Sequence, residues 1–118
     1  MNIEEFRNYC LAKNGVTESL PFDNETLVFK VMNKMFGLTN IHGDFSINLK
    51  CDTEKAIELR GLYPSVLPGY HMNKKHWNTI IIDGSVNDDL LFEWIDESYN
   101  LVVENLPVKV RNELRRGG

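Results

Sequence analysis

The sequence predicts an α+β fold, a two-layer sandwich in which an antiparallel sheet is covered by helices on one face. Helix-like and strand-like runs follow one another in the order α-β-β-β-α-β-β-α. Short polar segments join the strand-like runs, which favours antiparallel neighbours because parallel pairing needs a long crossover. The last helix-like run has the longest apolar stripe, so we expect it to cover the sheet. A chain of 118 residues is long enough for one core, and we expect a single domain over residues 1–118.

The first predicted helix runs from Asn2 to Asn14. Asn2 is a favourable capping residue, and Glu5, three residues later, is placed to return the hydrogen bond. Gly15 supplies the stop, because glycine tolerates the left-handed conformation that often follows a helix. From Thr17 to Asn24 we expect a loop, since Pro21 excludes a helix through this segment.

Three strand-like runs follow, at residues 26–31, 35–41 and 45–50. The first is rich in β-branched and aromatic residues, and a polar turn at Asn33-Lys34 separates it from the second. In the third run, Phe45, Ile47 and Leu49 alternate with polar residues. This period of two predicts one buried face and one face in contact with water.

A second helix is expected from Asp52 or Thr53 to about Leu62. Pro64 and Pro68 end it and enforce an extended stretch. Residues 77–83, which read WNTIIID, give the strongest strand signal in the chain. Their three consecutive isoleucines predict either cover on both faces or a central position in the sheet.

The last helix is expected to begin near Asn87, where Asp88 and Asp89 suit the positive end of the helix dipole. Pro107 either breaks this helix or opens a short final one. The apolar face falls at steps of three and four residues and consists of Leu91, Trp94, Ile95, Ser98, Leu101, Val102 and Leu106.

Charge is unevenly distributed along an acidic chain. The net charge is −4, to which residues 1–27 contribute −3, residues 28–80 contribute +3 and residues 81–118 contribute −4. This balance argues against a protein that binds nucleic acid over its whole surface. The middle segment is the part that is able to present a basic face. The alternative is that its lysines only solvate strands and turns.

Composition and patterning also bear on location. No apolar run approaches the roughly 18 residues that a membrane span needs, and the first residues lack the basic and apolar regions of a secretory signal. Two cysteines do not form a disulfide scaffold, so reduced thiols are the simpler interpretation. We therefore expect a cytoplasmic protein with no membrane partner.

The sequence offers little for metal binding or catalysis. His71 and His76 are five residues apart, and neither Cys-x-x-Cys nor His-x-x-x-His spacing occurs. Cys10 and Cys51 have no recognisable base beside them in the sequence, and glycine-rich phosphate loops and Gly-x-Ser-x-Gly are absent. We expect no metal, no cofactor and no enzymatic activity.

One segment carries a family signature. It reads PGYHMNKKHWNT from Pro68 to Thr79 and is followed by Asp83-Gly84-Ser85. DESY at residues 96–99, Leu106-Pro107 and YCLAKNG at residues 9–15 accompany it. Together these segments resemble the MmcQ/YjbR-like family of small bacterial proteins, and the similarity extends from about Glu4 to about Leu114.

The resemblance implies a two-layer α/β fold and DNA binding through two strand-and-loop wings on the sheet. On this hypothesis Lys74 and Lys75 contact phosphates, and His76 adds a donor. Trp77 either positions the loop, or stacks on a base, or lies in the core. The same surface is extended by Lys30, Lys34 and Lys50 if the first hairpin lies alongside.

The function expected from these observations is weak, salt-dependent and non-catalytic DNA binding by a monomer, through a basic sheet face and the loop Asn73–Trp77. The alternative is a protein- or ligand-binding module with no nucleic-acid contact. The acidic net charge favours that alternative, and domains of this architecture often bind a partner on an open sheet face or in a groove.

Overall fold

The computed structural model describes residues 1–69 and 72–117. Its centre is a six-stranded sheet with the strand order β1-β2-β3-β4-β6-β5, in which every neighbouring pair is antiparallel. This architecture confirms the predicted α+β fold. The strands are β1 (Val16–Ser19), β2 (Thr26–Val31), β3 (Lys34–Asn40), β4 (Ser46–Lys50), β5 (Val66–Pro68) and β6 (Trp77–Ile81).

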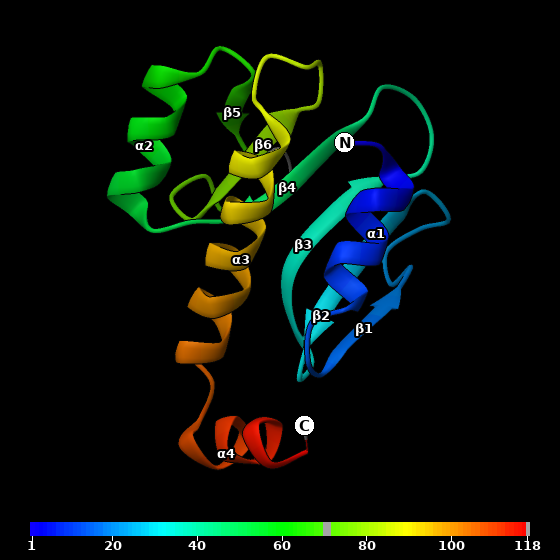
Figure 1. The fold of residues 1–118 in the computed structure, drawn as a ribbon, viewed down its shortest axis with the longest axis vertical. Helices are drawn as coiled ribbons and strands as arrows, with labels where there is room; N and C mark the ends of the chain where they lie inside the picture. The colour runs from blue at the N-terminus through cyan, green and yellow to red at the C-terminus, as the bar shows by residue number, and fades with distance from the viewer. Residues whose placement is uncertain (70–71, 118) are drawn as a thin grey trace.

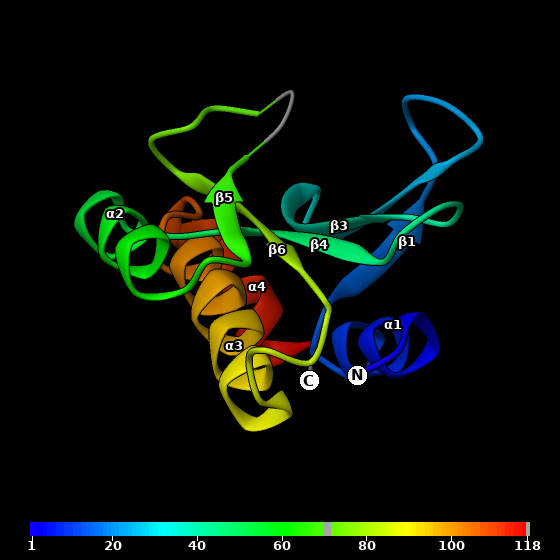
Figure 2. The same cartoon turned by 90° about the horizontal axis from the view of Figure 1, so that it is seen from above.

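The helices lie on one side of this sheet (Figures 1 and 2). Figure 2 shows α1 and α3 below the sheet with α4 behind them, and α2 beside the edge formed by β5 and β6. The β1–β2 and β5–β6 connections rise from the opposite face. The helices are α1 (Ile3–Leu11), α2 (Thr53–Leu62), α3 (Asp88–Glu104) and α4 (Val108–Arg116). Within the described residues, none of them is long and apolar enough to cross a membrane.

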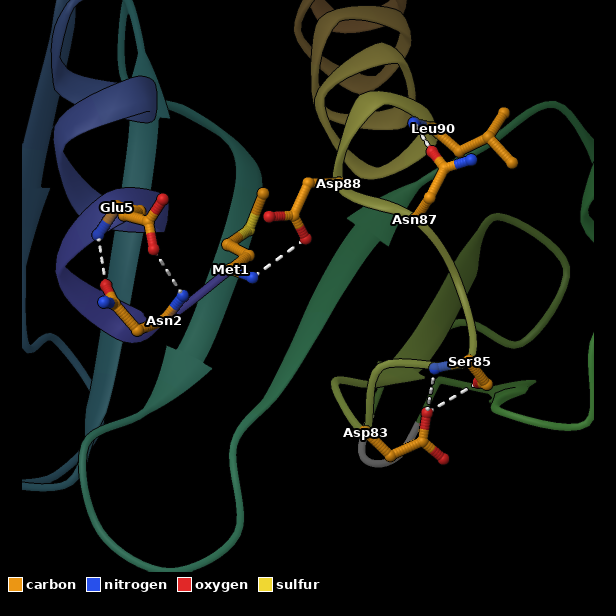
Figure 3. A network of polar contacts seen from close by, with 8 residues as sticks. All are labelled: Met1, Asn2, Glu5, Asp83, Ser85, Asn87, Asp88 and Leu90. Atoms are coloured by element: carbon orange, nitrogen blue, oxygen red, sulfur yellow. Dashed lines mark hydrogen bonds and ion pairs between the residues drawn. The ribbon is translucent and has the colours of Figure 1, made fainter.

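Helices α1 and α3 begin at the asparagine capping residues that the sequence predicts (Figure 3). Asn2 Oδ1 accepts from the Glu5 backbone N–H at 2.8 Å, and Glu5 Oε1 accepts from the Asn2 N–H at 3.2 Å. Asn87 Oδ1 likewise accepts from the Leu90 N–H at 2.9 Å. The Met1 amino group lies 2.8 Å from Asp88 Oδ1, so the starts of α1 and α3 are held side by side.

The main core lies between the sheet and the helices. Ile47 and Leu49 of β4 belong to it, whereas Asn48 and Lys50 are on the other face, so the predicted alternation of facing is confirmed. The expected contact of that other face with water is wrong at Asn48, which is itself buried. The face of α3 is confirmed as well, since five of its predicted residues are buried within the helix. The largest fully buried apolar side chains are Phe6, Phe29, Phe36, Ile47, Leu91 and Ile95.

A buried serine joins α3 to two strands. The pairing of β2 with β3 shifts between Phe29 and Lys30, and this bulge leaves Phe36 without a cross-strand partner. Ser98 Oγ donates to the Phe36 carbonyl at 2.5 Å and accepts from the Lys50 N–H at 2.9 Å. The hydroxyl therefore satisfies two backbone groups that the ladder leaves unpaired at the sheet centre.

The structure corrects several boundaries. Residues 16–19 form β1, which pairs with β2. The sequence predicts a loop from Thr17 on account of Pro21, but Pro21 lies beyond the end of this strand and does not prevent it. The turn before β3 lies at Met32 and Asn33, whose φ angles are 47° and 69°. β6 pairs with β4 and β5, so it is an interior strand but lies second from the edge and not at the centre of the sheet. Of the two alternatives for Pro107, the second holds, because α3 ends at Glu104 and α4 follows.

Replacement of the buried serine is expected to destabilise the protein. Ser98→Ala leaves a buried N–H and a buried carbonyl unsatisfied, which should lower the free energy of unfolding by about 2 kcal/mol or more. Urea denaturation measures the change. Asn100→Ala, on the exposed side of the same helix, is the control and should stay within about 0.5 kcal/mol of the wild type. Equal stability of the Ser98 variant and the control would contradict this assignment.

Candidate nucleic-acid interface

The sheet face opposite the helices carries a small apolar cluster within a polar surface. Val28, Leu38 and Trp77 form the cluster, with Met35 and Met72 packed against it. We call this surface the open face. By strand alternation and cross-strand pairing it comprises Thr26, Val28, Lys30, Met35, Leu38, Asn40, Ser46, Asn48, Lys50, Trp77 and Thr79.

Trp77 is part of this cluster and is only 6% exposed. The Gly69 N–H donates to the Trp77 carbonyl at 2.9 Å, and a Cβ at Gly69 would lie 2.8 Å from the Trp77 Cβ. The absence of a side chain at Gly69 therefore allows the two ends of the β5–β6 connection to approach closely. Of the alternatives for Trp77, burial among apolar side chains therefore holds, and its ring is not exposed for stacking on a base.

The lysines of the first hairpin and of β4 converge on the end of β4. Lys34 and Lys50 line one hollow of about 360 Å³. Lys50 and His76 line another, of about 250 Å³, and Asn105 at the end of α3 lines both hollows. Lys30 lies opposite Met35, which lines the first hollow.

Lys74 and Lys75 are exposed on the β5–β6 connection, whose described part is held in shape by hydrogen bonds. Asn73 Oδ1 accepts from the Lys75 N–H at 2.9 Å. The Asn73 carbonyl accepts from the N–H groups of His76 at 3.1 Å and Trp77 at 3.0 Å. The two lysines are thus presented on an ordered turn. His71, considered above for its spacing to His76, lies outside the described residues.

Arg60 of α2 supports this turn from below. Its Nε donates to Asn78 Oδ1 at 2.7 Å, and its Nη2 donates to the Lys74 carbonyl. The Asn78 Nδ2 in turn donates to the Ala56 carbonyl at 3.3 Å, which links the turn, β6 and α2. No local sequence pattern marks Arg60, since only the folded chain brings α2 next to a turn that follows it by more than ten residues.

The five predicted lysines have no acidic partner within 4.0 Å in the parts of the chain at 1–69 and 72–117. Three cations of the helix layer are instead paired: Arg7 with Glu18 at 2.8 Å, Lys13 with Asp96, and Lys55 with Glu97 at 2.7 Å. These paired cations hold the helices together or fix them to the sheet. Lys109 on α4 is unpaired in the same parts of the chain as well, but it lies in the helix layer, away from the open face.

The two thiols are poor nucleophiles at neutral pH. Burial raises the pKa of Cys10 to about 12. Burial also raises the pKa of Cys51 to about 11, although Lys55 opposes the shift. No group of three or more histidine, cysteine or acidic side chains in the described residues is arranged to hold a metal ion.

The sequence model of the YjbR family matches residues 11–101, which include the five predicted lysines. The chain belongs to the YjbR family. The family expected from the PGYHMNKKHWNT signature is therefore confirmed.

Individual YjbR relatives agree with this assignment. The chain is 41% identical to the uncharacterised protein YbdF of Escherichia coli over 98 residues, which span 82% of this chain and 80% of YbdF. It is 34% identical to the uncharacterised protein YjbR of Escherichia coli over 115 residues, 97% of this chain and 98% of that protein.

Solved structures of similar sequence have the same fold. The crystal structure of the Deinococcus radiodurans protein DR2400 superimposes with a TM-score of 0.91 at 42% identity, covering 96% of this chain and 87% of DR2400. A protein from Pseudomonas syringae superimposes with a TM-score of 0.73 at 28% identity, covering 86% of this chain and 98% of that one.

The thiols are expected to react slowly with iodoacetamide. Because only the thiolate attacks and both pKa values are raised, less than about one thousandth of Cys51 is ionised near pH 7.5. The alkylation rate should rise about tenfold per pH unit until the pH approaches 11, as mass spectrometry of the modified protein would show. The urea-unfolded chain is the control. Rapid labelling of the folded protein at pH 7.5 would contradict the expectation.

Loss of the Arg60 contacts should loosen the β5–β6 turn. In Arg60→Ala the Lys74 carbonyl and Asn78 lose their donor, so we expect faster amide exchange at His76 and Trp77, measured by hydrogen–deuterium exchange. Glu58→Ala, on an exposed position of the same helix, should leave these amides unchanged. If exchange at the turn is the same in both variants, Arg60 does not support the turn.

Proposed function

We propose that the protein binds DNA without catalysing a reaction, through phosphate contacts of the unpaired lysines around the open face. The observation that carries the proposal is the contrast between paired and unpaired cations. Arg7, Lys13 and Lys55, which join the helices to one another or to β1, are engaged with acids, whereas Lys30, Lys34, Lys50, Lys74 and Lys75 around the open face are not. Cations without an internal partner are available to neutralise phosphates and release counterions.

The shape of the molecule supports the same function. The helices cover one face of the sheet, and two connections rise from the other face, which carries no helix (Figure 2). Lys74 and Lys75 project from one connection, while Lys30 and Lys50 lie on this face. Phosphate contacts of this kind set position and affinity but carry no sequence information.

The acidic helix layer limits the strength of this binding. Asp88, Asp89 and Glu93 lie on α3, on the opposite side of the sheet from the open face. Their charge attracts no phosphate, and it lowers the potential over the whole molecule. The expected affinity is therefore modest and steeply dependent on salt.

A second candidate is a ligand-binding module without nucleic-acid contact. It is favoured by one observation, a pocket of about 330 Å³ on the open face, whose volume falls in the range of about 300–1,000 Å³ that small-molecule sites occupy. The two candidates differ in what the lysines do, because a neutral ligand in this pocket does not need them.

Charge reversal of the turn tests the proposal. Lys74→Glu combined with Lys75→Glu should weaken binding of a fluorescent duplex at low salt by tenfold or more. It should also reduce the slope of log affinity against log salt by about 2, since two phosphate contacts are lost. Fluorescence anisotropy titrations at low and moderate salt measure both quantities.

The matched control moves the same charge elsewhere. Lys109→Glu with Arg116→Glu changes two exposed cations of α4, in the helix layer. This control should keep the salt slope and lose affinity only through net charge. If both double variants bind alike, or if the wild type fails to bind at low salt, the proposed interface is wrong.

A further inference from the structure

The pocket on the open face is lined by apolar side chains, amides, hydroxyls and one carboxylate. We call it the loop pocket, and its volume is about 330 Å³. Residues from both the β1–β2 and the β5–β6 connections line it. Its walls and floor include Phe22 and Asp23 from the β1–β2 connection, Leu38 and Asn40 from β3, Asn48 from β4, and Met72.

The floor presents amide donors. The side-chain oxygen of Asn48 accepts from the Thr79 hydroxyl at 2.5 Å, and that of Asn40 accepts from the Thr26 hydroxyl at 3.4 Å. With their oxygens engaged in this way, both asparagines have their Nδ2 groups without a protein partner in the described residues. Two amide donors on neighbouring strands are therefore available to acceptors of a bound molecule, such as ring carbonyls.

The charge of the lining excludes a phosphate from the pocket itself. Asp23 is its one ionisable side chain within the described residues. The Asp23 carboxylate accepts from the N–H groups of Glu25 at 2.8 Å and Thr26 at 2.7 Å, and these bonds lower its pKa, so it is ionised at neutral pH. An anion in the pocket would meet a negative charge and no cation. A neutral group is the occupant that this lining accepts.

The apolar part of the lining favours a flat occupant. Leu38 and Met72 belong to the apolar cluster of the open face. Phe22, at 65% exposure, is the most exposed large apolar side chain in the described residues. An exposed aromatic ring beside a pocket with amide donors is suited to stacking on a planar heterocycle.

We propose that the loop pocket binds one unstacked base of single-stranded DNA, with Phe22 stacked on the base and Asn40 and Asn48 donating to its ring carbonyls. The lysines outside the lining then hold the adjoining phosphates, and in this respect the inference rests on the proposed function. A base in a duplex has its pairing edge occupied and its faces stacked, so it cannot enter. The pocket therefore makes the protein prefer single strands.

Oligothymidylate is the probe, because its bases neither pair with one another nor stack strongly. The comparison strand is an abasic oligonucleotide of equal length and charge, and anisotropy at low salt measures both affinities. Wild-type protein should bind oligothymidylate at least about fivefold more tightly than the abasic strand, the lower end of what stacking on one aromatic ring contributes. A duplex of the same length should gain nothing from the pocket.

A pair of loop variants tests the stacking residue. Phe22→Ala should weaken oligothymidylate binding about fivefold or more and leave the affinity for the abasic strand unchanged. Leu20→Ala, on a residue that is 45% exposed in the same connection and does not line the pocket, should bind both strands as the wild type does. Both side chains are exposed, so neither substitution should unfold the protein.

Thymidine, which has no phosphate, separates this inference from the proposed function. In ¹⁵N NMR titrations, thymidine should shift the side-chain amide signals of Asn40 and Asn48 in the wild type and not in Phe22→Ala. Shifts with thymidine but no binding of any strand would remove the DNA function and keep the base site. Equal affinity for oligothymidylate and the abasic strand, with no thymidine shifts, would overturn the base site and leave phosphate binding intact.

Discussion

The attachment of α3 to the centre of the sheet determines how the two faces differ. Ser98 bonds to the Phe36 carbonyl and the Lys50 N–H, and the apolar residues on the same side of the helix pack against β3 and β4. A 17-residue helix fixed in this way shields one face of the sheet. Every polar residue that alternates with the core is then directed to the other face, and there the candidate interface is formed.

Charge pairing follows the same division. In the helix layer, Lys13 and Lys55 meet Asp96 and Glu97 of α3, so cations of other elements neutralise acids of this helix. The net charge of −4 is thus a sum over segments of opposite sign, since residues 28–80 carry +3. Net charge describes the whole molecule, whereas association depends on the local field over one surface.

Local patterns in the sequence are sufficient to predict much of the fold. The alternation in β4, the caps Asn2 and Asn87 and the stripe of α3 depend on residues a few positions apart, and all agree with the structure. β1 was missed because four residues give no periodic signal and their pairing with β2 is a tertiary event. Arg60 and Phe22 were missed for a similar reason, since each acquires its neighbours from distant segments only after folding.

The two ends of the sheet have a consequence for association between copies of the protein. The outer strands, β1 and β5, contain four and three residues, and β5 ends in a proline that cannot donate to a further strand. The carboxylate of Glu18, paired with Arg7, adds a charged group to the β1 border. Such borders offer a poor template for strand addition. The open face is uncovered and partly apolar, but the short outer strands protect the molecule against edge-to-edge aggregation. The sequence gives only a weak signal for these two strands.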